Sequence, residues 1–145
     1  MSKDTCLCID LRTAAQKLTQ MYDEAMVASG ITVTQFSQLH QIQALEGPTL
    51  KQLAEATGLD RSTLGRNVRV LEKLDLVTIK AGEDARTRTI HLTRKGKNAF
   101  TKAVPLWYGI QSELTERLGL GGRSQLNEMI TTLTAPVIAV QEARG

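Results

Sequence analysis

Short polar side chains and long cationic side chains alternate between residues 61 and 73. The hydroxyl and amide groups can exchange hydrogen bonds at close range, whereas guanidinium and ammonium groups reach anionic oxygens farther away. That mixture suits base edges flanked by phosphates, although an ordinary solvated helix surface has a similar composition. The candidate contact residues are Arg61, Ser62, Thr63, Arg66, Asn67, Arg69 and Lys73.

Positive charge is concentrated around the same stretch. Residues 48–104 carry 12 Lys or Arg and 6 Asp or Glu, whereas residues 1–47 carry 3 and 5, and residues 105–145 carry 3 and 4. Cations placed along phosphates release condensed counterions, so a segment of net charge +6 favours a polyanionic partner. Aromatic residues make up only 3% of the chain, too few to stack successive bases of a single strand. Double-stranded DNA is therefore the expected partner.

Apolar spacing places these side chains on the second helix of a helix-turn-helix. Residues 50–57 and residues 61–73 each bring apolar side chains to one helical face. Between them, Gly58 can adopt the left-handed conformation of a tight turn, and Asp60 can cap the second helix. The sequence therefore predicts a recognition helix whose polar residues face outward.

A β-hairpin is predicted directly after this helix. Residues 77–80 and 88–92 are rich in β-branched side chains and flank a longer loop, residues 81–87. Arg86 and Arg88 make the tip of this hairpin basic. A basic hairpin beside a recognition helix is typical of the wing of a winged helix-turn-helix. The hairpin therefore favours the DNA-binding interpretation of residues 61–73 over that of a solvated surface helix.

Two helices are predicted before this region. Residues 9–28 bring apolar side chains to one face at intervals of three and four, and Gly30 ends this helix. Thr34 can cap a second helix that runs to about Leu45.

Helices are also predicted after the hairpin. Pro105 should kink or break the first of them, because proline lacks an amide hydrogen and crowds the preceding turn. A last helix follows Gly122, and its tail, residues 137–140, is too apolar to stay in water. Apolar surface at both ends predicts a homodimer. The expected organisation is one protomer, residues 1–145, with residues 34–104 as the DNA-binding region and residues 1–30 and 105–145 as dimerisation helices.

At these positions the chain resembles the MarR family of transcriptional regulators. The resemblance rests on Asp60-Arg61-Ser62-Thr63-Leu64 at the start of the recognition helix, and on a wing pattern formed by Asp84, Arg86, Leu92, Thr93 and Gly96. It implies a mainly α fold with a small β-hairpin, and a homodimer on a palindromic operator. It also implies that Arg86 enters the minor groove while Asp84 holds the shape of the wing. Asp75 departs from the pattern, since the family usually has glycine there.

The resemblance further implies a cleft for small aromatic or phenolic ligands. Tyr22, His40 and Trp107 are the candidates for its lining, and simple packing is the alternative for each.

Cys6 and Cys8 are the candidate redox residues. Cys8 matches the reactive cysteine of the branch of the family that senses organic peroxides, at a helix N-terminus where thiolate is favoured. Tyr22 matches one tyrosine that holds this cysteine in that branch, whereas Arg12 stands where the other partner is expected. An inert terminus is the alternative. A bond between Cys6 and Cys8 would be strained, so oxidation should join chains or small thiols. A metal site is the weaker alternative: only His40 and His91 could add imidazole, and a closed four-ligand site would also need acids or a second subunit.

The remaining features limit the function classes. No apolar run spans a bilayer and no secretory signal is evident, so a cytoplasmic protein is expected. No phosphate loop, paired carboxylates or nucleophile–base spacing suggests an enzyme, and no cofactor is expected. The sequence predicts a sequence-specific dimeric regulator, a repressor released by a small ligand or by cysteine oxidation. Its alternatives are a weakly specific architectural DNA-binding protein and a winged helix used for protein contacts.

Overall fold

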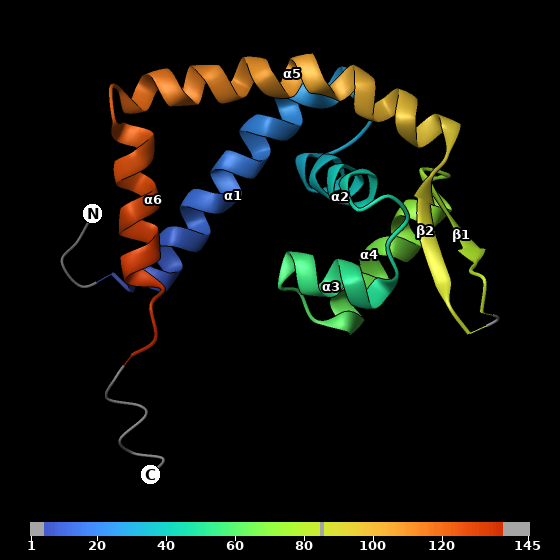
Figure 1. Ribbon diagram of the computed structural model, residues 1–145. Coiled ribbons are helices and arrows are strands. Elements are labelled where there is room, and N and C mark those ends of the chain that lie inside the picture. Colours follow the sequence, from blue (N-terminus) through green and yellow to red (C-terminus); the bar gives the residue numbers. More distant parts are fainter. Residues whose placement is uncertain (1–4, 85, 138–145) are drawn as a thin grey trace, which may run out of the picture. The chain divides into compact units, whose positions relative to one another are not determined.

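The computed structural model describes residues 5–84 and 86–137 (Figure 1). Its elements, in chain order, are α1 (Leu7–Met26), a short 3-10 helix η1 (Val27–Ser29), α2 (Val33–Ala44), α3 (Leu50–Thr57), α4 (Arg61–Lys73), β1 (Val77–Ala81), β2 (Arg88–Leu92), α5 (Arg94–Leu118) and α6 (Gly122–Leu133). The fold is a winged helix-turn-helix, mainly α with one antiparallel hairpin, which confirms the predicted class. Residues 138–140 of the expected apolar tail lie outside the described residues.

The chain divides into two compact units, residues 1–110 and residues 111–145. The first unit contains the helix-turn-helix, the hairpin and most of α5. The second contains the end of α5 and α6. No helix in the described ranges combines the length and apolarity needed to cross a membrane.

The core of the first unit is built from one face of each of its helices. Leu53 of α3 is 1% exposed. One face of α2 and one face of α4 are buried as well, through Phe36, Leu39 and Ile42, and through Leu64, Val68 and Leu71. Burying a side chain of this size stabilises the fold by roughly 1.5–3 kcal/mol. The largest fully buried residues are Met26, Leu39, Ile42, Leu53, Leu64, Leu71, Val77 and Pro48.

Paired hydrogen bonds begin α2 and α3. Thr32, not Thr34 as predicted, is the cap of α2: its hydroxyl accepts from the Gln35 amide at 3.2 Å, and the Gln35 side chain accepts from the Thr32 amide at 3.0 Å. The prediction was wrong because it ignored the glutamine three residues after Thr32, the partner that completes a capping box. Thr49 and Gln52 repeat this arrangement at α3.

A close backbone contact fixes the base of the wing. The Thr93 amide donates to the Leu76 carbonyl at 3.1 Å, and its hydroxyl donates to the Asp75 carbonyl at 2.6 Å. A Cβ atom at Gly96 would overlap the Leu76 carbonyl oxygen, so only glycine permits this approach. The pattern Leu92-Thr93 followed by Gly96 therefore has a structural function: it fixes the start of α5 against the corner between α4 and β1.

Pro105 lies inside α5 and does not end it, so of the predicted kink or break the break does not occur. The missing amide donor would serve the carbonyl of Thr101, which is an exposed residue. Buried residues on both sides of the proline, Ala103 and Ile110, keep one helical face against the core.

In the second unit, α6 begins after Gly121, which has φ 73°. Its apolar residues Met129, Ile130 and Leu133 are 63%, 46% and 47% exposed in the single chain.

Candidate nucleic-acid interface

The turn between α3 and α4 has the geometry that its sequence predicts. Gly58 ends α3 in the left-handed conformation, with φ 70°, and its amide donates to the Ala54 carbonyl at 2.9 Å. The Thr57 hydroxyl accepts from the Leu59 amide at 3.3 Å. α4 then begins at Arg61, as predicted.

Asp60 organises the first turn of α4. Its carboxylate accepts from the Thr63 amide at 2.6 Å, and from the Thr63 and Ser62 hydroxyls at 3.0 Å each. These hydrogen bonds, that of the Thr63 amide first, hold the pKa of Asp60 below its usual value. The Thr63 hydroxyl in turn accepts from Nη2 of Arg66 at 3.4 Å. Ser62 and Thr63, predicted as DNA contacts, thus already donate to Asp60 and keep only lone pairs for a new donor.

The outward face of α4 is a row of cationic and polar side chains. Leu64, Val68 and Leu71 are buried, so helix geometry turns the opposite face to solvent. That face carries Ser62, Arg66, Arg69 and Lys73, all exposed, which we call the α4 row. Arg61 is exposed to one side of it.

Two other residues of α4 differ from the simple pattern. Asn67 is half-buried and lines a hollow between α2, α3 and α4 instead of standing in the row. Val70, not singled out in the sequence, is 50% exposed beside the row. The sequence could have predicted this exposure, because Val70 does not share the helical face of the buried residues Leu64, Val68 and Leu71.

Backbone hydrogen bonds shape the wing. The Gly82 amide donates to the Thr87 carbonyl at 2.6 Å, and the Thr87 amide donates to the Asp84 carbonyl at 2.9 Å. The Asp84 carboxylate accepts from the Arg86 amide at 3.3 Å, and the Arg86 side chain is exposed. Arg88 is exposed at the start of β2.

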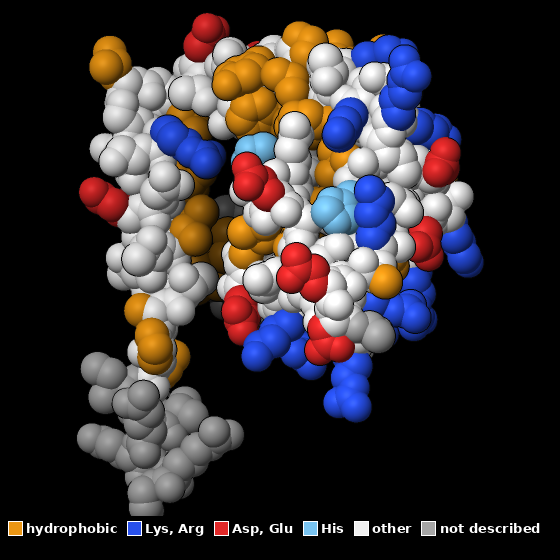
Figure 2. Space-filling view, turned by 45° about the vertical axis from the view of Figure 1, so that its right-hand side comes forward, with side chains coloured by type: hydrophobic (Ala, Val, Ile, Leu, Met, Phe, Trp, Pro, Cys, Tyr) orange, Lys and Arg blue, Asp and Glu red, His pale blue; other side chains and the backbone are white. Residues whose placement is uncertain are grey.

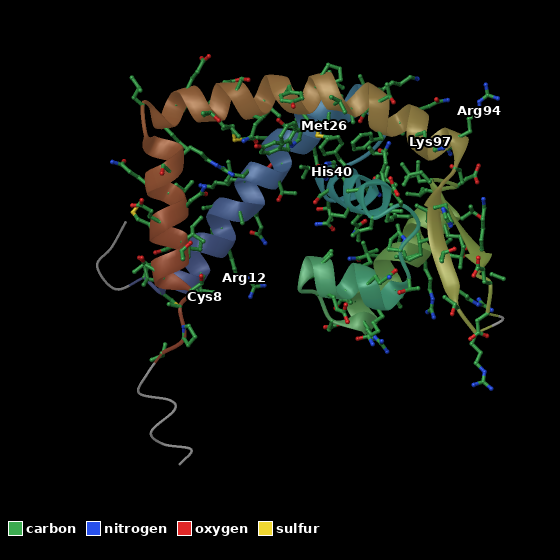
Figure 3. All side chains as sticks on the ribbon, in the orientation of Figure 1. Cys8, Arg12, Met26, His40, Arg94 and Lys97 are labelled. Carbon is green, nitrogen blue, oxygen red and sulfur yellow. The ribbon has the colours of Figure 1, made fainter. Side chains whose placement is uncertain are left out.

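The cations of the first unit are spread over more than one part of its surface. Figure 2 shows Lys and Arg side chains at the upper right of this unit, along its right side and at its lower edge. Arg94 and Lys97 lie at the end of the hairpin away from its loop (Figure 3). Five-residue strands separate them from the wing tip by about 17 Å. The charge count of residues 48–104 therefore overstates the cations available to one DNA surface.

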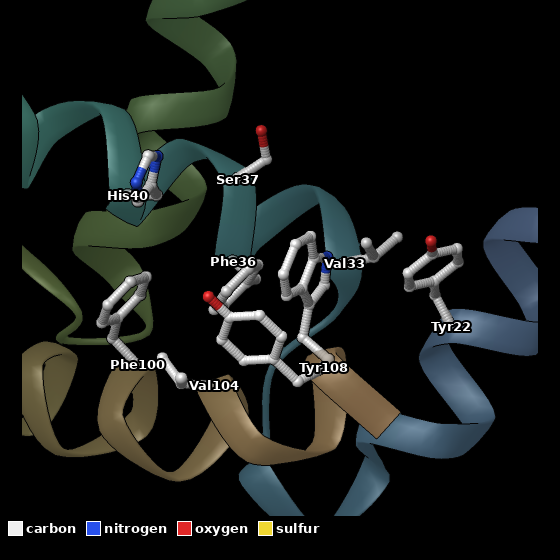
Figure 4. A pocket seen from close by; sticks show the side chains of 9 residues that line it. Tyr22, Val33, Phe36, Ser37, His40, Phe100, Val104 and Tyr108 are labelled. Carbon is white, nitrogen blue, oxygen red and sulfur yellow. The ribbon is translucent and has the colours of Figure 1, made fainter. Parts of the chain in front are cut away.

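An aromatic hollow lies in the first unit, between α2 and α5 (Figure 4). Its volume is about 610 Å³, and it brings together all three predicted ligand residues, Tyr22, His40 and Trp107. Phe36 stacks with Phe100 at 4.9 Å between ring centroids, and with Trp107 at 5.7 Å. Aromatic walls with a histidine and a serine at the edge suit a planar ligand that has a few polar groups.

The cysteines lie at the beginning of α1. Cys6 is its cap residue and Cys8 is in its first turn, and both are exposed free thiols (Figure 3). Arg12 stands one turn beyond Cys8 and is exposed, as expected. Tyr22 lies on the same helix, and fourteen residues at 1.5 Å rise put it about 21 Å from Cys8. One chain therefore does not bring Cys8 and Tyr22 together. In residues 5–84 and 86–137, no group of three His, Cys, Asp or Glu side chains could hold a metal ion.

Three comparisons with known proteins agree with this geometry. A model of the MarR family matches residues 29–87, from η1 to the wing. The M. tuberculosis transcriptional regulator MosR, solved in complex with DNA, is 40% identical with a TM-score of 0.78, over 97% of this chain and 100% of that one. The chain belongs to the MarR family.

More distant relatives extend this MarR-family assignment. The transcriptional repressor CouR, solved on a 23-mer DNA duplex, is 25% identical with a TM-score of 0.76, over 88% of this chain and 92% of that one. An uncharacterized HTH-type transcriptional regulator of Bacillus cereus is 32% identical over 93 residues, 64% of this chain, and the match spans 62% of the relative's length.

The departure from the MarR-family pattern at Asp75 has little effect on the fold. This residue adopts the left-handed conformation, with φ 58°, at the place where the MarR family usually has glycine. Aspartate is among the residues that tolerate this region best after glycine and asparagine. α4 still ends at Lys73, so the substitution leaves the helix end where it was predicted.

Proposed function

We propose that this MarR-family regulator is a dimeric, sequence-specific repressor that places α4 in the major groove and the wing in the minor groove. The observation that carries the proposal is the α4 row, because it presents Arg66, Arg69 and Lys73 together on the face opposite the core. MosR and CouR, which were solved on DNA, support the same use of this fold. Base and phosphate contacts on α4 would set sequence preference and register.

The recognition chemistry follows from the side chains. Arg66 can fork onto a guanine edge or a phosphate, and Thr63 positions it. A narrow minor groove concentrates negative potential, which attracts the guanidinium of Arg86. Arg61, Asn67 and Arg88 are proposed as flanking contacts.

Dimerisation is proposed through apolar faces that have no partner in the single chain. On α1, Leu7, Leu11 and Leu18 share one helical face and are 64%, 47% and 43% exposed. On α6, Met129, Ile130 and Leu133 share another. A second copy that covers both faces would place two recognition helices on half-sites about 34 Å apart.

Release from DNA is proposed to follow either ligand binding or cysteine oxidation. The aromatic hollow would take a small aromatic or phenolic ligand, with His40 as a polar contact. The exposed thiols of Cys6 and Cys8 are accessible to a hydroperoxide. Arg12 is proposed as part of the same site, one helical turn beyond Cys8, and Tyr22 of a second copy could reach Cys8 where Tyr22 of the same chain cannot.

The test is fluorescence anisotropy of the purified protein on its own upstream DNA and on a scrambled duplex. Tighter binding to the upstream DNA by at least about tenfold is expected of a specific regulator. Equal affinity for both duplexes would instead support the architectural alternative. Repeating the titration at several salt concentrations separates phosphate contacts from base contacts.

Cumene hydroperoxide followed by dithiothreitol tests the redox switch. Peroxide should release wild-type protein from the upstream DNA, dithiothreitol should restore binding, and Cys8→Ser should bind throughout. The matched Cys6→Ser variant shows which thiol reacts first, and intact-mass measurement distinguishes a mixed disulfide from a bond between chains. Release that persists in Cys8→Ser would remove this cysteine from the mechanism.

A further inference from the structure

A second hollow lies against the recognition helix, on a face of α2 that adjoins the aromatic hollow. It has a volume of about 400 Å³ and is lined by residues of α2, α3, α4 and the intervening turn, including Leu53, Leu59 and Leu64. Val33 and Ser37 line both hollows, so only this part of α2 separates them. In Figure 4 the Ser37 side chain points away from the aromatic rings.

The polar lining of this hollow is made of side-chain amides. Gln38 and Gln41 come from α2, and Asn67 comes from α4; we call the site the amide hollow. All three are half-buried, and within the described part of the chain their side chains form no hydrogen bond with another residue. Half-buried amides without partners favour a ligand that supplies both a donor and an acceptor.

Charge narrows the class of ligand. None of the residues that line either hollow is Asp, Glu, Lys or Arg. A charged group would lose hydration here without gaining a counter-ion, whereas a carboxamide or hydroxyl group would exchange hydrogen bonds with the amides. The leucines beneath them suit a short aliphatic segment.

We propose that the amide hollow is a second ligand subsite, which binds the uncharged polar group of a ligand whose aromatic ring occupies the aromatic hollow. This deepens the proposed function, on whose ligand switch it rests. A molecule bound in this way contacts α2, α3 and α4 at once. Asn67 stands beside Arg66 on α4, so occupancy acts on the recognition helix directly. DNA affinity then changes by as much as the ligand's affinities for the free and DNA-bound forms differ.

The direct test uses full-length, ¹⁵N-labelled protein without DNA. Hydrocinnamamide, a phenyl ring joined by two methylene groups to an uncharged carboxamide, is titrated against the side-chain amide signals of Gln38, Gln41 and Asn67 and the indole signal of Trp107. All are expected to move along one saturable curve. Hydrocinnamate, the matched carboxylate, is expected to bind at least about tenfold more weakly.

Variants decide whether the shifts come from this site. Gln41→Leu should weaken binding at least about tenfold, and Asn67→Ala should do the same, each with an otherwise dispersed spectrum. Gln43→Leu is the control, since Gln43 lies on α2 outside both hollows. Movement of the indole signal alone, no movement at all, or equal weakening by Gln43→Leu would each overturn the proposal.

Anisotropy on the upstream duplex then tests the coupling. Saturating hydrocinnamamide should change DNA affinity in wild type and leave it unchanged in Gln41→Leu. Unchanged affinity in wild type with the probe bound would overturn the link to α4. A protein that binds the probe but no DNA would instead contradict the proposed repressor function and leave the subsite standing.

Discussion

Asp60 shows how one residue can serve both stability and recognition. Its carboxylate holds the amide and hydroxyl of Thr63, and that hydroxyl meets Arg66 of the α4 row. A cap that also orients the nearest arginine reduces the rotamer freedom that this side chain must lose on DNA. The sequence identified Asp60 as the cap. It did not show that the hydroxyl groups of Ser62 and Thr63 donate to Asp60, because side-chain orientation depends on the three-dimensional positions of the neighbouring atoms and not on residue spacing.

The cap predicts a pH dependence. The pKa of Asp60 is lowered in the folded protein, so its contribution to stability is complete above the unfolded value near 4 and is lost as the pH falls through the folded value. Asp60→Asn keeps a capping oxygen and does not titrate. Thermal unfolding followed by circular dichroism should show wild type losing stability relative to Asp60→Asn below about pH 4. A constant difference between the two across this range would contradict the assignment.

Two glycines of α5 make a matched pair. Gly96→Ala should destabilise the protein by about 1–3 kcal/mol or more, because the new methyl group overlaps the Leu76 carbonyl. Gly109→Ala meets no atom within 4 Å and should stabilise the helix by up to about 1 kcal/mol. Urea unfolding monitored by circular dichroism measures both. Equal effects at the two positions would mean that the base of the wing is not held as described.

At the scale of elements, the wing is predicted to contribute to DNA binding, whereas the other end of the hairpin is not. Arg86→Ala should weaken binding to the upstream DNA and lower the salt slope by about 0.9 for each phosphate that the protein no longer neutralises. Arg94→Ala is the control, because Arg94 is an exposed arginine at the other end of the hairpin. Anisotropy at several salt concentrations measures both variants. Equal weakening by the two would mean that the effect comes from overall charge and not from the wing.

The elements that sequence predicted best are those with distinct chemical boundaries. α3 and α4 were placed correctly because Gly58 and Asp60 mark their shared turn with unambiguous backbone chemistry. Thr34 was the wrong cap because the signal is local: a threonine two positions earlier had the better partner. Pro105 did not break α5, because the apolar stripe of the helix outweighed one missing amide donor. Tertiary packing decides such cases, and a single sequence does not display it.

The whole molecule is predicted to bind DNA only as a dimer. Leu18→Lys places a charge on the apolar face of α1 and should shift the protein toward monomer, with about a hundredfold reduction of affinity for the full operator. Val27→Lys is the control, because Val27 is 74% exposed and follows α1 in η1. Analytical ultracentrifugation gives the oligomeric state. A Leu18→Lys variant that remains dimeric would exclude this face from the interface.

The candidate sites differ in how much of each could be predicted from the sequence. The polar residues of α4 and the basic wing could be named from spacing, since a surface helix shows its polar face directly. The amide hollow could not, because Gln38, Gln41 and Asn67 are unremarkable in sequence and meet only when α2 and α4 pack. The charge count of residues 48–104 was the least specific predictor of the DNA contacts, because it includes Arg94 and Lys97, which lie at the end of the hairpin away from the wing tip.

The aromatic hollow has one more property, which concerns how the protein can be observed. The chain has one tryptophan and two tyrosines, and Tyr22, Trp107 and Tyr108 all line that hollow. Near-ultraviolet absorbance and intrinsic emission therefore originate at one place in the molecule. A ligand that occupies the aromatic hollow is therefore expected to change the wavelength or intensity of the intrinsic fluorescence. Compound collections can be screened by fluorescence on the unlabelled protein, without an attached dye.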